Sequence, residues 1–272
     1  MGLDTNTWVE FDQGRYHIRA LAPFKRFRGL DIPWDLPTEQ LDDETEYVVK
    51  SSRSRKVVKL AAGQYGLPVE LIVKRYYLRT WLRRLLRTGR KSRAREEFDL
   101  GWRLMKNDIR TPRPVWLAEG RGTAAQYSLL ATEALPGAES ALDRWLRCDT
   151  EQQRRELLVA LGRFTAQLHD AGLHHDDYKA DHLLIFPDRP SVPKEFYLID
   201  LLGASFPPVL SRLRCAKSLY QMIRSFVPKR KEFGFTTEHR DVFLMAYAGS
   251  PMEAAGWSRW VRRVGRLKGR VV

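Results

Sequence analysis

Short runs of β-branched residues alternate with polar or Gly/Pro segments over the first half of the chain. Runs of this kind, bounded by turn residues, are typical of strands in an antiparallel meander. Between them, residues 92–107 have helical spacing, with Phe98 and Trp102 four positions apart. The expected strands cover residues 47–50, 56–60, 69–77, 114–120 and 125–135. The first half is therefore expected to form a small antiparallel sheet with one main helix.

The second half has mainly helical spacing. Thr150 and Gln153 have the separation of a capping box at the start of a helix. Apolar residues then recur every three or four positions from 157 to 168, until Gly172 ends the pattern. Residues 210–264 are again mainly helical in pattern. A larger helical lobe is thus expected to follow the sheet.

Changes in composition and hydrophobic spacing divide the chain into three parts. Residues 1–46 mix Pro, Gly and acidic residues and are expected to be an irregular lead-in. Residues 47–136 are expected to form an N-terminal lobe and residues 137–272 a C-terminal lobe. The hinge is placed at Pro136 and Gly137, where the residue pattern changes from that of strands to that of helices. The fold class is therefore α+β with two lobes.

Composition limits the structural class and the cellular compartment of the protein. Among 272 residues, 43% are hydrophobic, which is enough for one core or two joined cores. Cys148 and Cys215 are too few for a disulfide scaffold or a zinc cluster. The polar, acidic N-terminus does not have the basic start and apolar run of a signal peptide. We therefore expect a cytoplasmic protein.

The net charge of +14 predicts attraction to a polyanion. Residues 74–95 hold ten Lys or Arg and no acid, and they fit either an anion-binding surface or a solvated helix face. A second basic segment, 257–266, places Trp and Val opposite Arg at helical spacing. This segment fits an interfacial helix or, given its glycine, a frayed basic tail.

The segment HHDDYKADHLLIF at 174–186 carries the strongest chemical signal. His175 precedes Asp177 by two positions, and His182 follows it by five, which is the spacing of a kinase catalytic loop. Asp177 is expected to orient the acceptor hydroxyl, His182 to bind a metal ion and His175 to brace the loop. Asp181 is the alternative metal ligand.

Two further positions complete a kinase pattern. Asp200 ends the apolar run FYLID, where kinases place a magnesium-binding Asp. Lys74 ends another apolar run and is expected to contact ATP phosphates, held by Glu97 of the following helix. Glu96 competes with Glu97 for this role, because helical phase alone does not separate them. The expected fold is thus protein-kinase-like, with ATP and Mg2+ as cofactors.

These motifs together resemble the lipopolysaccharide core kinases of the Kdo/WaaP type, within the protein-kinase-like superfamily. In that family a His commonly stands at the position of His182. The resemblance implies transfer of the ATP γ-phosphate to a heptose or Kdo hydroxyl of the lipopolysaccharide inner core. It also implies an anionic glycolipid substrate, lipid A core included, and a site at the cytoplasmic face of a bacterial inner membrane. The resemblance covers residues 47–205 and rests on VKRYY, AREEF, TPRPV, HHDDYKADHLLI and LIDLLGA.

The chain also departs from the kinase pattern. The segment SSRSRK after the first strand has no glycine where protein kinases carry a Gly-rich phosphate loop. Ser52 in this segment and Glu133 beside the hinge are the remaining candidate nucleotide contacts. Asp200 is followed by Leu201 and not by Phe, and Asp176 stands where Arg or Gly is frequent.

Two other functions stay open. One is a kinase for a protein or another small acceptor, although the basic charge disfavours cationic acceptors such as aminoglycosides. Another is a pseudokinase or polyanion-binding module without turnover, favoured by the missing glycine loop. Nucleic acid is not expected as a partner, because the basic runs have no recognition motif or zinc site. No obligate protein partner is expected, whereas an anionic membrane surface is an open option.

Overall fold

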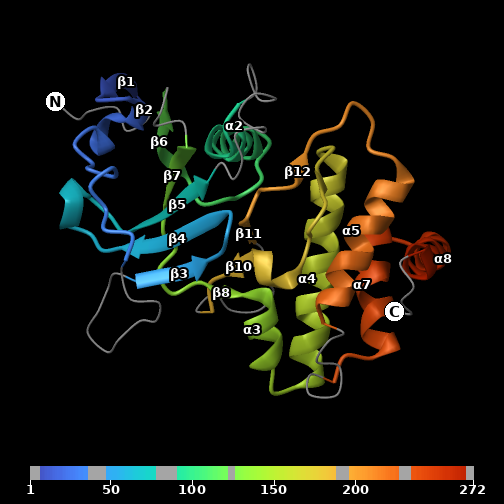
Figure 1. Ribbon diagram of the computed structural model, residues 1–272. Helices are drawn as coiled ribbons and strands as arrows, with labels where there is room; N and C mark the ends of the chain where they lie inside the picture. The colour runs from blue at the N-terminus through green and yellow to red at the C-terminus, as the bar shows by residue number, and fades with distance from the viewer. Residues whose placement is uncertain are drawn as a thin grey trace. The chain divides into compact units, whose positions relative to one another are not determined.

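The computed structural model divides into two compact units, a sheet unit and a helical unit (Figure 1). The sheet unit comprises Met1–Arg103 and Pro112–Pro136, and the helical unit comprises Leu104–Thr111 and Gly137–Val272. The structure describes residues 7–35, 47–77, 91–121, 126–187, 196–226 and 234–267. Residues 78–90, most of the basic run at 74–95, lie outside the described residues.

The sheet unit is built on one antiparallel sheet with strand order β1-β2-β6-β7-β5-β4-β3. Helix α2 (Arg93–Lys106) lies between β5 and β6 in the sequence. The strands are β1 (Trp8–Gln13), β2 (Tyr16–Leu21), β3 (Tyr47–Ser51), β4 (Arg55–Leu60), β5 (Leu71–Tyr77), β6 (Pro114–Gly120) and β7 (Tyr127–Glu133). The strands and helix predicted from residue 47 onward are confirmed, with ends shifted by a few residues at most.

The prediction of an irregular lead-in is wrong for residues 8–21. Strands β1 and β2 form a hairpin with a two-residue turn, in which Gly14 has φ 57°. This hairpin extends the sheet through pairing of β2 with β6. Trp8 packs edge-on against Phe98 and Trp102 of α2, each at 5.2 Å between ring centroids. Buried aromatic area thus fixes a segment whose Pro, Gly and acidic composition suggests a loop.

The helical unit consists of long helices with short strands between them. Its helices are α3 (Ala141–Leu146), α4 (Glu151–Asp170), α5 (Arg212–Ser225), α7 (Thr237–Ala248) and α8 (Pro251–Leu267). Its short elements are β8 (Glu139–Ser140), β9 (His174–His175), η4 (Ala180–His182), β10 (Leu183–Ile185), β11 (Tyr197–Leu198) and β12 (Ala204–Ser205). The fold class predicted from the sequence is therefore confirmed: an antiparallel N-terminal sheet followed by a helical part.

Helix α4 packs closely against α7. The predicted capping box is present, with the Thr150 hydroxyl accepting from the backbone of Gln153 and the Gln153 side chain accepting in return. At Gly162 the backbone of α7 comes so close that a Cβ atom would lie 2.6 Å from the carbonyl oxygen of Phe243. Glycine is thus required where the two helices cross.

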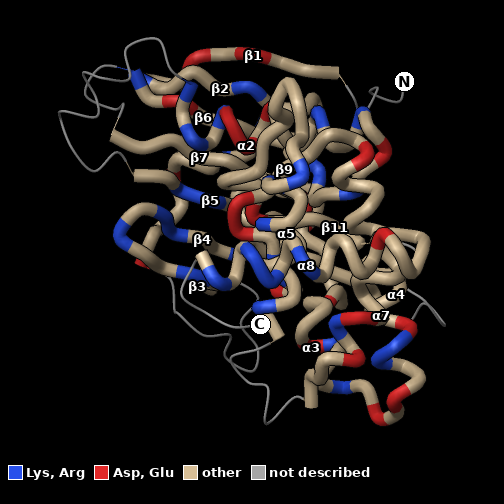
Figure 2. The backbone as a smooth tube through the Cα atoms, turned by 90° about the vertical axis from the view of Figure 1, so that its right-hand side faces the viewer, with Lys and Arg blue, Asp and Glu red and all other residues tan. Residues whose placement is uncertain are grey.

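Basic residues occur along both units and are not confined to one element (Figure 2). Segment 257–266 forms part of α8, so the alternative of a frayed tail is wrong for these residues. No helix within the described ranges is long and apolar enough to cross a membrane.

Candidate active site

In the sheet unit, Lys74 forms a buried ion pair with Glu97. The Lys74 Nζ atom donates to Oε1 of Glu97, and their side chains are 12% and 3% exposed. Lys74 lies on β5 and Glu97 in α2. Glu96, the competing carboxylate, is exposed. The structure therefore pairs Lys74 with Glu97, which helical phase alone left undecided.

Tyr76 completes this cluster and was not foreseen from the sequence. Its hydroxyl donates to the second carboxylate oxygen of Glu97, and the residue is only 2% exposed. Burial first, then the charge and hydrogen bond of Glu97, raise the pKa of Tyr76 well above its usual value. Tyr76 shares a strand face with Lys74 because side chains two positions apart point the same way. The i, i+2 spacing was the available signal.

Ser52 closes the turn between β3 and β4. Its hydroxyl accepts from the backbone N–H of Arg55 at 3.2 Å and donates to the Arg55 carbonyl at 3.0 Å. A serine side chain thus supplies the turn contacts here. The role of Ser52 toward a nucleotide stays a prediction.

Glu133 ends β7, close to the end of the sheet unit. Its backbone N–H donates to the carbonyl of Arg113, and its carboxylate lies 3.6 Å from the Arg113 guanidinium. Burial raises the pKa of Glu133, and the charge of Arg113 opposes that shift. A nucleotide contact by Glu133 likewise stays a prediction.

In the helical unit, His175 braces two segments that are far apart in the sequence. Its Nδ1 atom accepts from the backbone N–H of Asp177 at 3.1 Å, so Nε2 carries the proton and donates to the Asp200 carbonyl at 3.1 Å. Burial first, then the nearby His182, lower the pKa of His175 to about 4. A neutral imidazole therefore ties the segment of Asp177 to that of Asp200.

His182 has its ring fixed so that Nε2 faces Asp200. Its Nδ1 atom donates to the Asp177 carbonyl at 2.9 Å, which leaves a lone pair on Nε2 in the neutral ring. Burial is the first cause of the lowered pKa of His182. The Nε2 atom lies 3.8 Å from Oδ2 of Asp200. Asp181, the alternative ligand, is exposed.

His182 and Asp200 are near enough to reach one cation. In an octahedral Mg2+ shell, ligand atoms at about 2.1 Å lie about 3.0 Å apart when adjacent and about 4.2 Å apart when opposite, so the observed separation of 3.8 Å has to change slightly when the ion binds. Within the described residues, no group of three or more His, Cys, Asp or Glu is placed to hold a metal ion. Two protein ligands suit Mg2+, because water and phosphate oxygens usually complete its shell, although imidazole is not its preferred ligand.

Asp200 has an unusual backbone conformation, with φ 54°. A left-handed non-glycine residue costs free energy and tends to mark functional sites. The hydrogen bond from His175 to its carbonyl holds the residue in place, two positions after the end of β11. Its side chain is 20% exposed, which leaves the carboxylate partly accessible.

The adjacent carboxylates of Asp176 and Asp177 have different partners. Oδ2 of Asp177 lies 2.9 Å from Nζ of Lys179, and the Asp177 side chain is 53% exposed. Oδ1 of Asp176 lies 3.0 Å from Nε2 of the buried His174. Lys179 and His174 were both missed in the sequence analysis. For Lys179, its position two residues after Asp177 was the available signal.

Known proteins similar to this chain point to one family. Residues 39–247 match the model of the Lipopolysaccharide kinase (Kdo/WaaP) family. The lipopolysaccharide core heptose(I) kinase WaaP of Pseudomonas aeruginosa is 28% identical over 182 residues, which cover 62% of this chain and 66% of that protein. The match thus spans slightly less than two thirds of that relative.

A solved structure has a similar fold. The chain described as "WaaP in complex with acyl carrier protein" superposes with a TM-score of 0.61 at 23% identity. The superposition covers 90% of this chain and 96% of that one. At this identity the likeness concerns the fold alone.

Proposed function

The chain belongs to the lipopolysaccharide kinase (Kdo/WaaP) family, and we propose that it transfers the γ-phosphoryl group of ATP to a sugar hydroxyl of lipopolysaccharide. The acceptor would be heptose or Kdo of the inner core. Membership confirms, at the level of the family, the resemblance and the kinase class inferred from the sequence. The observation that carries the proposal for this chain is the His175 brace between the segments of Asp177 and Asp200.

Asp177 is proposed as the catalytic carboxylate. Its half-exposed side chain is accessible to an acceptor hydroxyl, which it would orient and from which it would take the proton. Lys179, 2.9 Å from the same carboxylate, would add positive charge beside the transferred phosphoryl group. Asp176 is proposed to lie outside the reaction, since His174 holds it.

Asp200 and His182 are proposed as the magnesium ligands. The lone pair of His182 Nε2 on the side of Asp200 and the partial exposure of Asp200 support this assignment. Magnesium, when bound, neutralises charge on the phosphates of ATP. The chain's own task here is to hold the two ligands at a fixed spacing, through the contacts of His175 and His182 with the backbone.

Lys74 is proposed to contact the ATP phosphates. Glu97 holds its ammonium group, and Tyr76 holds Glu97, so the lysine is oriented before the nucleotide arrives. Ser52 and Glu133 remain proposed nucleotide contacts. Ser52 is the weaker proposal, because its hydroxyl already forms hydrogen bonds within its turn.

An anionic glycolipid acceptor agrees with the charge of the protein. With a net charge of +14, the protein attracts phosphorylated sugars and repels cationic acceptors. We propose a cytoplasmic site of action, at the inner face of the inner membrane, where such an acceptor would be presented. The acyl carrier protein named with the solved WaaP structure is a partner of that protein, and none is assigned to this chain.

A pseudokinase is the second candidate function. It is favoured by one observation, the turn closed by Ser52 where protein kinases have a Gly-rich phosphate loop. A module of this kind would bind nucleotide or polyanions without turnover. The same transfer assay separates the two candidates.

The test is magnesium-dependent transfer of labelled γ-phosphate from ATP to dephosphorylated lipopolysaccharide, to a generic protein, and to water alone. Label in the glycolipid that is lost in Asp177→Ala and kept in Asp176→Ala supports the proposal. Label in the protein acceptor would identify a protein, and not a glycolipid, as the substrate. Absence of transfer to every acceptor, with ATP still bound, favours the pseudokinase.

A further inference from the structure

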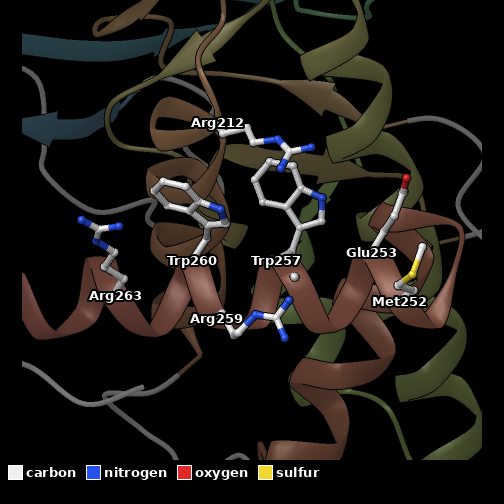
Figure 3. A pocket seen from close by; sticks show the side chains of 8 residues that line it. Arg212, Met252, Glu253, Trp257, Arg259, Trp260 and Arg263 are labelled. Atoms are coloured by element: carbon white, nitrogen blue, oxygen red, sulfur yellow. The ribbon is translucent and has the colours of Figure 1, made fainter.

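Helix α8 carries a groove of about 580 Å³ lined by two tryptophans and three arginines (Figure 3). The indoles of Trp257 and Trp260 project on the same side of the helix, and Arg212 of α5 lies over them. Arg259 and Arg263, one turn apart on α8, line the same groove. Aromatic and cationic side chains thus form one surface in the helical unit.

The helix that carries the groove is held in place by packing. Ala254, Val261 and Val264 are buried along the face of α8 that also carries Trp257, and the helix packs against α5 and α7. Trp257 stands edge-on to Tyr247 of α7, with 5.3 Å between ring centroids and an interplanar angle of 80°. The guanidinium of Arg263 lies 5.4 Å from the ring centroid of Trp260. The aromatic side chains are therefore pre-ordered for contact.

The charge of the groove is predominantly positive. Arg212, Arg259 and Arg263 are exposed, and Glu253 is the one acid among the lining residues. Within the part of the chain that the structure describes, none of the three arginines forms an ion pair. Met252, 82% exposed, adds an apolar side chain to the same groove. An occupant must therefore combine negative charge with apolar surface.

A second groove, between α4 and α7, does not have this character. Its volume is about 520 Å³, but Glu238 and Asp241 stand beside its single basic residue, Arg163. The positive sign and the paired tryptophans thus distinguish the α8 groove from this second groove. This contrast also supplies a matched control residue, since Arg163 is exposed on α4.

We propose that the α8 groove docks the protein on the surface of an anionic phospholipid bilayer. Arginine binds headgroup phosphates through paired N–H groups, and an anionic leaflet attracts such clusters. Tryptophan favours the boundary between headgroups and acyl chains, where Trp257, Trp260 and Met252 would sit. Helix α8 then lies along the membrane surface. The inference does not rest on the proposed phosphoryl transfer, because none of these residues belongs to that machinery.

Charge reversal in the two grooves provides the test. The full-length protein is sedimented with vesicles of phosphatidylcholine alone or with phosphatidylglycerol added, at about 0.1 M salt. We expect binding to the anionic vesicles only, about tenfold weaker in Arg259→Glu and in Arg263→Glu, and nearly unchanged in Arg163→Glu. Equal losses in all three variants would mean that only net charge matters, and would overturn the docking surface.

Depth of insertion is a second readout that does not depend on charge. Lipids brominated on the acyl chain are expected to quench part of the tryptophan emission, and the quenched part should disappear in Trp257→Phe/Trp260→Phe. Unchanged quenching in this double variant contradicts the proposal. So does equal binding to vesicles of phosphatidylcholine alone. Failure of the wild type to bind any vesicle also overturns it, and leaves a protein partner as the occupant.

Discussion

The Tyr76 hydroxyl donates a hydrogen bond to the Glu97 carboxylate, on the oxygen that Lys74 does not use. Glu97 is therefore held from two directions by neighbours on one face of β5. A buried carboxylate with both oxygens satisfied is rigid, and so is the ammonium group that it orients. The cluster as a whole, and not the ion pair alone, positions Lys74.

Removing the Tyr76 hydroxyl should loosen this cluster. In Tyr76→Phe, one buried oxygen of Glu97 loses its donor, which costs about 1–3 kcal/mol in the free energy of unfolding. We also expect a KM for ATP that is raised about tenfold, because Lys74 is less well positioned. Tyr77→Phe, on the opposite face of the same strand, is the control. Denaturant unfolding and steady-state kinetics check both effects, and equal behaviour of the two variants would refute the role of Tyr76.

Neighbouring glutamates of α2 offer a matched pair of variants. Glu97→Gln removes the charge that holds Lys74, and kcat/KM should fall about 100-fold, the scale seen when one electrostatic contact in a transition state is lost. Glu96→Gln alters an exposed residue and should stay within about twofold of the wild type. Kinetics of both variants, with circular dichroism to verify folding, decide between the two carboxylates. A larger loss in Glu96→Gln would contradict the pairing seen in the structure.

For Glu96 and Glu97 of α2, the sequence alone does not predict which side chain is buried. The repeat of Phe98 and Trp102 located the helix, but Glu96 and Glu97 are 100° apart and both border its apolar stripe. Only the position of β5 relative to the helix decides which one is buried. Strand alternation predicts that Tyr76 lies on the same face of the strand as Lys74. It does not predict that the tyrosine contacts Glu97, because this contact depends on where the helix packs.

The N-terminal hairpin was missed for a different reason. Residues 8–21 alternate weakly, and their charged residues hide the pattern; the strand identity comes from pairing with β6 and from Trp8 packing on α2. Such non-local burial is invisible in a short window. By contrast, the loop at 174–186 was found because its chemistry requires fixed spacing along the chain.

Asp177 and Asp176 should differ sharply in their importance. Asp177→Asn removes the carboxylate that would take the acceptor proton, so kcat should fall by about 100-fold or more. ATP binding should persist, since Asp177 is not assigned to the nucleotide. In Asp176→Asn the amide can still accept from His174, and the loss should remain below about tenfold. Transfer assays and nucleotide titrations measure both, and a reversed order would show that the register of the loop is shifted by one residue.

Magnesium dependence should follow His182 and Asp200. Replacing Asp200 with Asn removes a charged ligand, and activity should require about tenfold more magnesium or vanish. His182→Asn keeps a short ligand with an oxygen atom, so it should retain part of the activity, whereas His182→Phe should not. Activity is measured against magnesium concentration after removal of metal with a chelator. Identical curves for Asn and Phe at 182 would exclude this residue as a ligand.

Acid should destabilise the helical unit through His169. Its Nδ1 atom lies 2.9 Å from the hydroxyl of Tyr247, and burial first, then the charge of His174, lower its pKa to about 4. The unfolded chain, with a pKa near the usual 6.5, therefore binds the proton more readily than the folded protein between these values. The contribution of neutral His169 is complete above pH about 6.5 and is lost as the pH falls toward about 4.

Two variants isolate this effect. In His169→Gln the free energy of unfolding should depend less steeply on pH between about 6.5 and 4, because the titrating group is absent. In Tyr247→Phe the slope should persist while stability drops by about 1 kcal/mol at every pH, because only a hydrogen bond is lost. Denaturant unfolding at a series of pH values separates the two cases. An unaltered slope in His169→Gln would assign the acid sensitivity to other groups, with His175 the next to test because its pKa is also lowered to about 4 by burial.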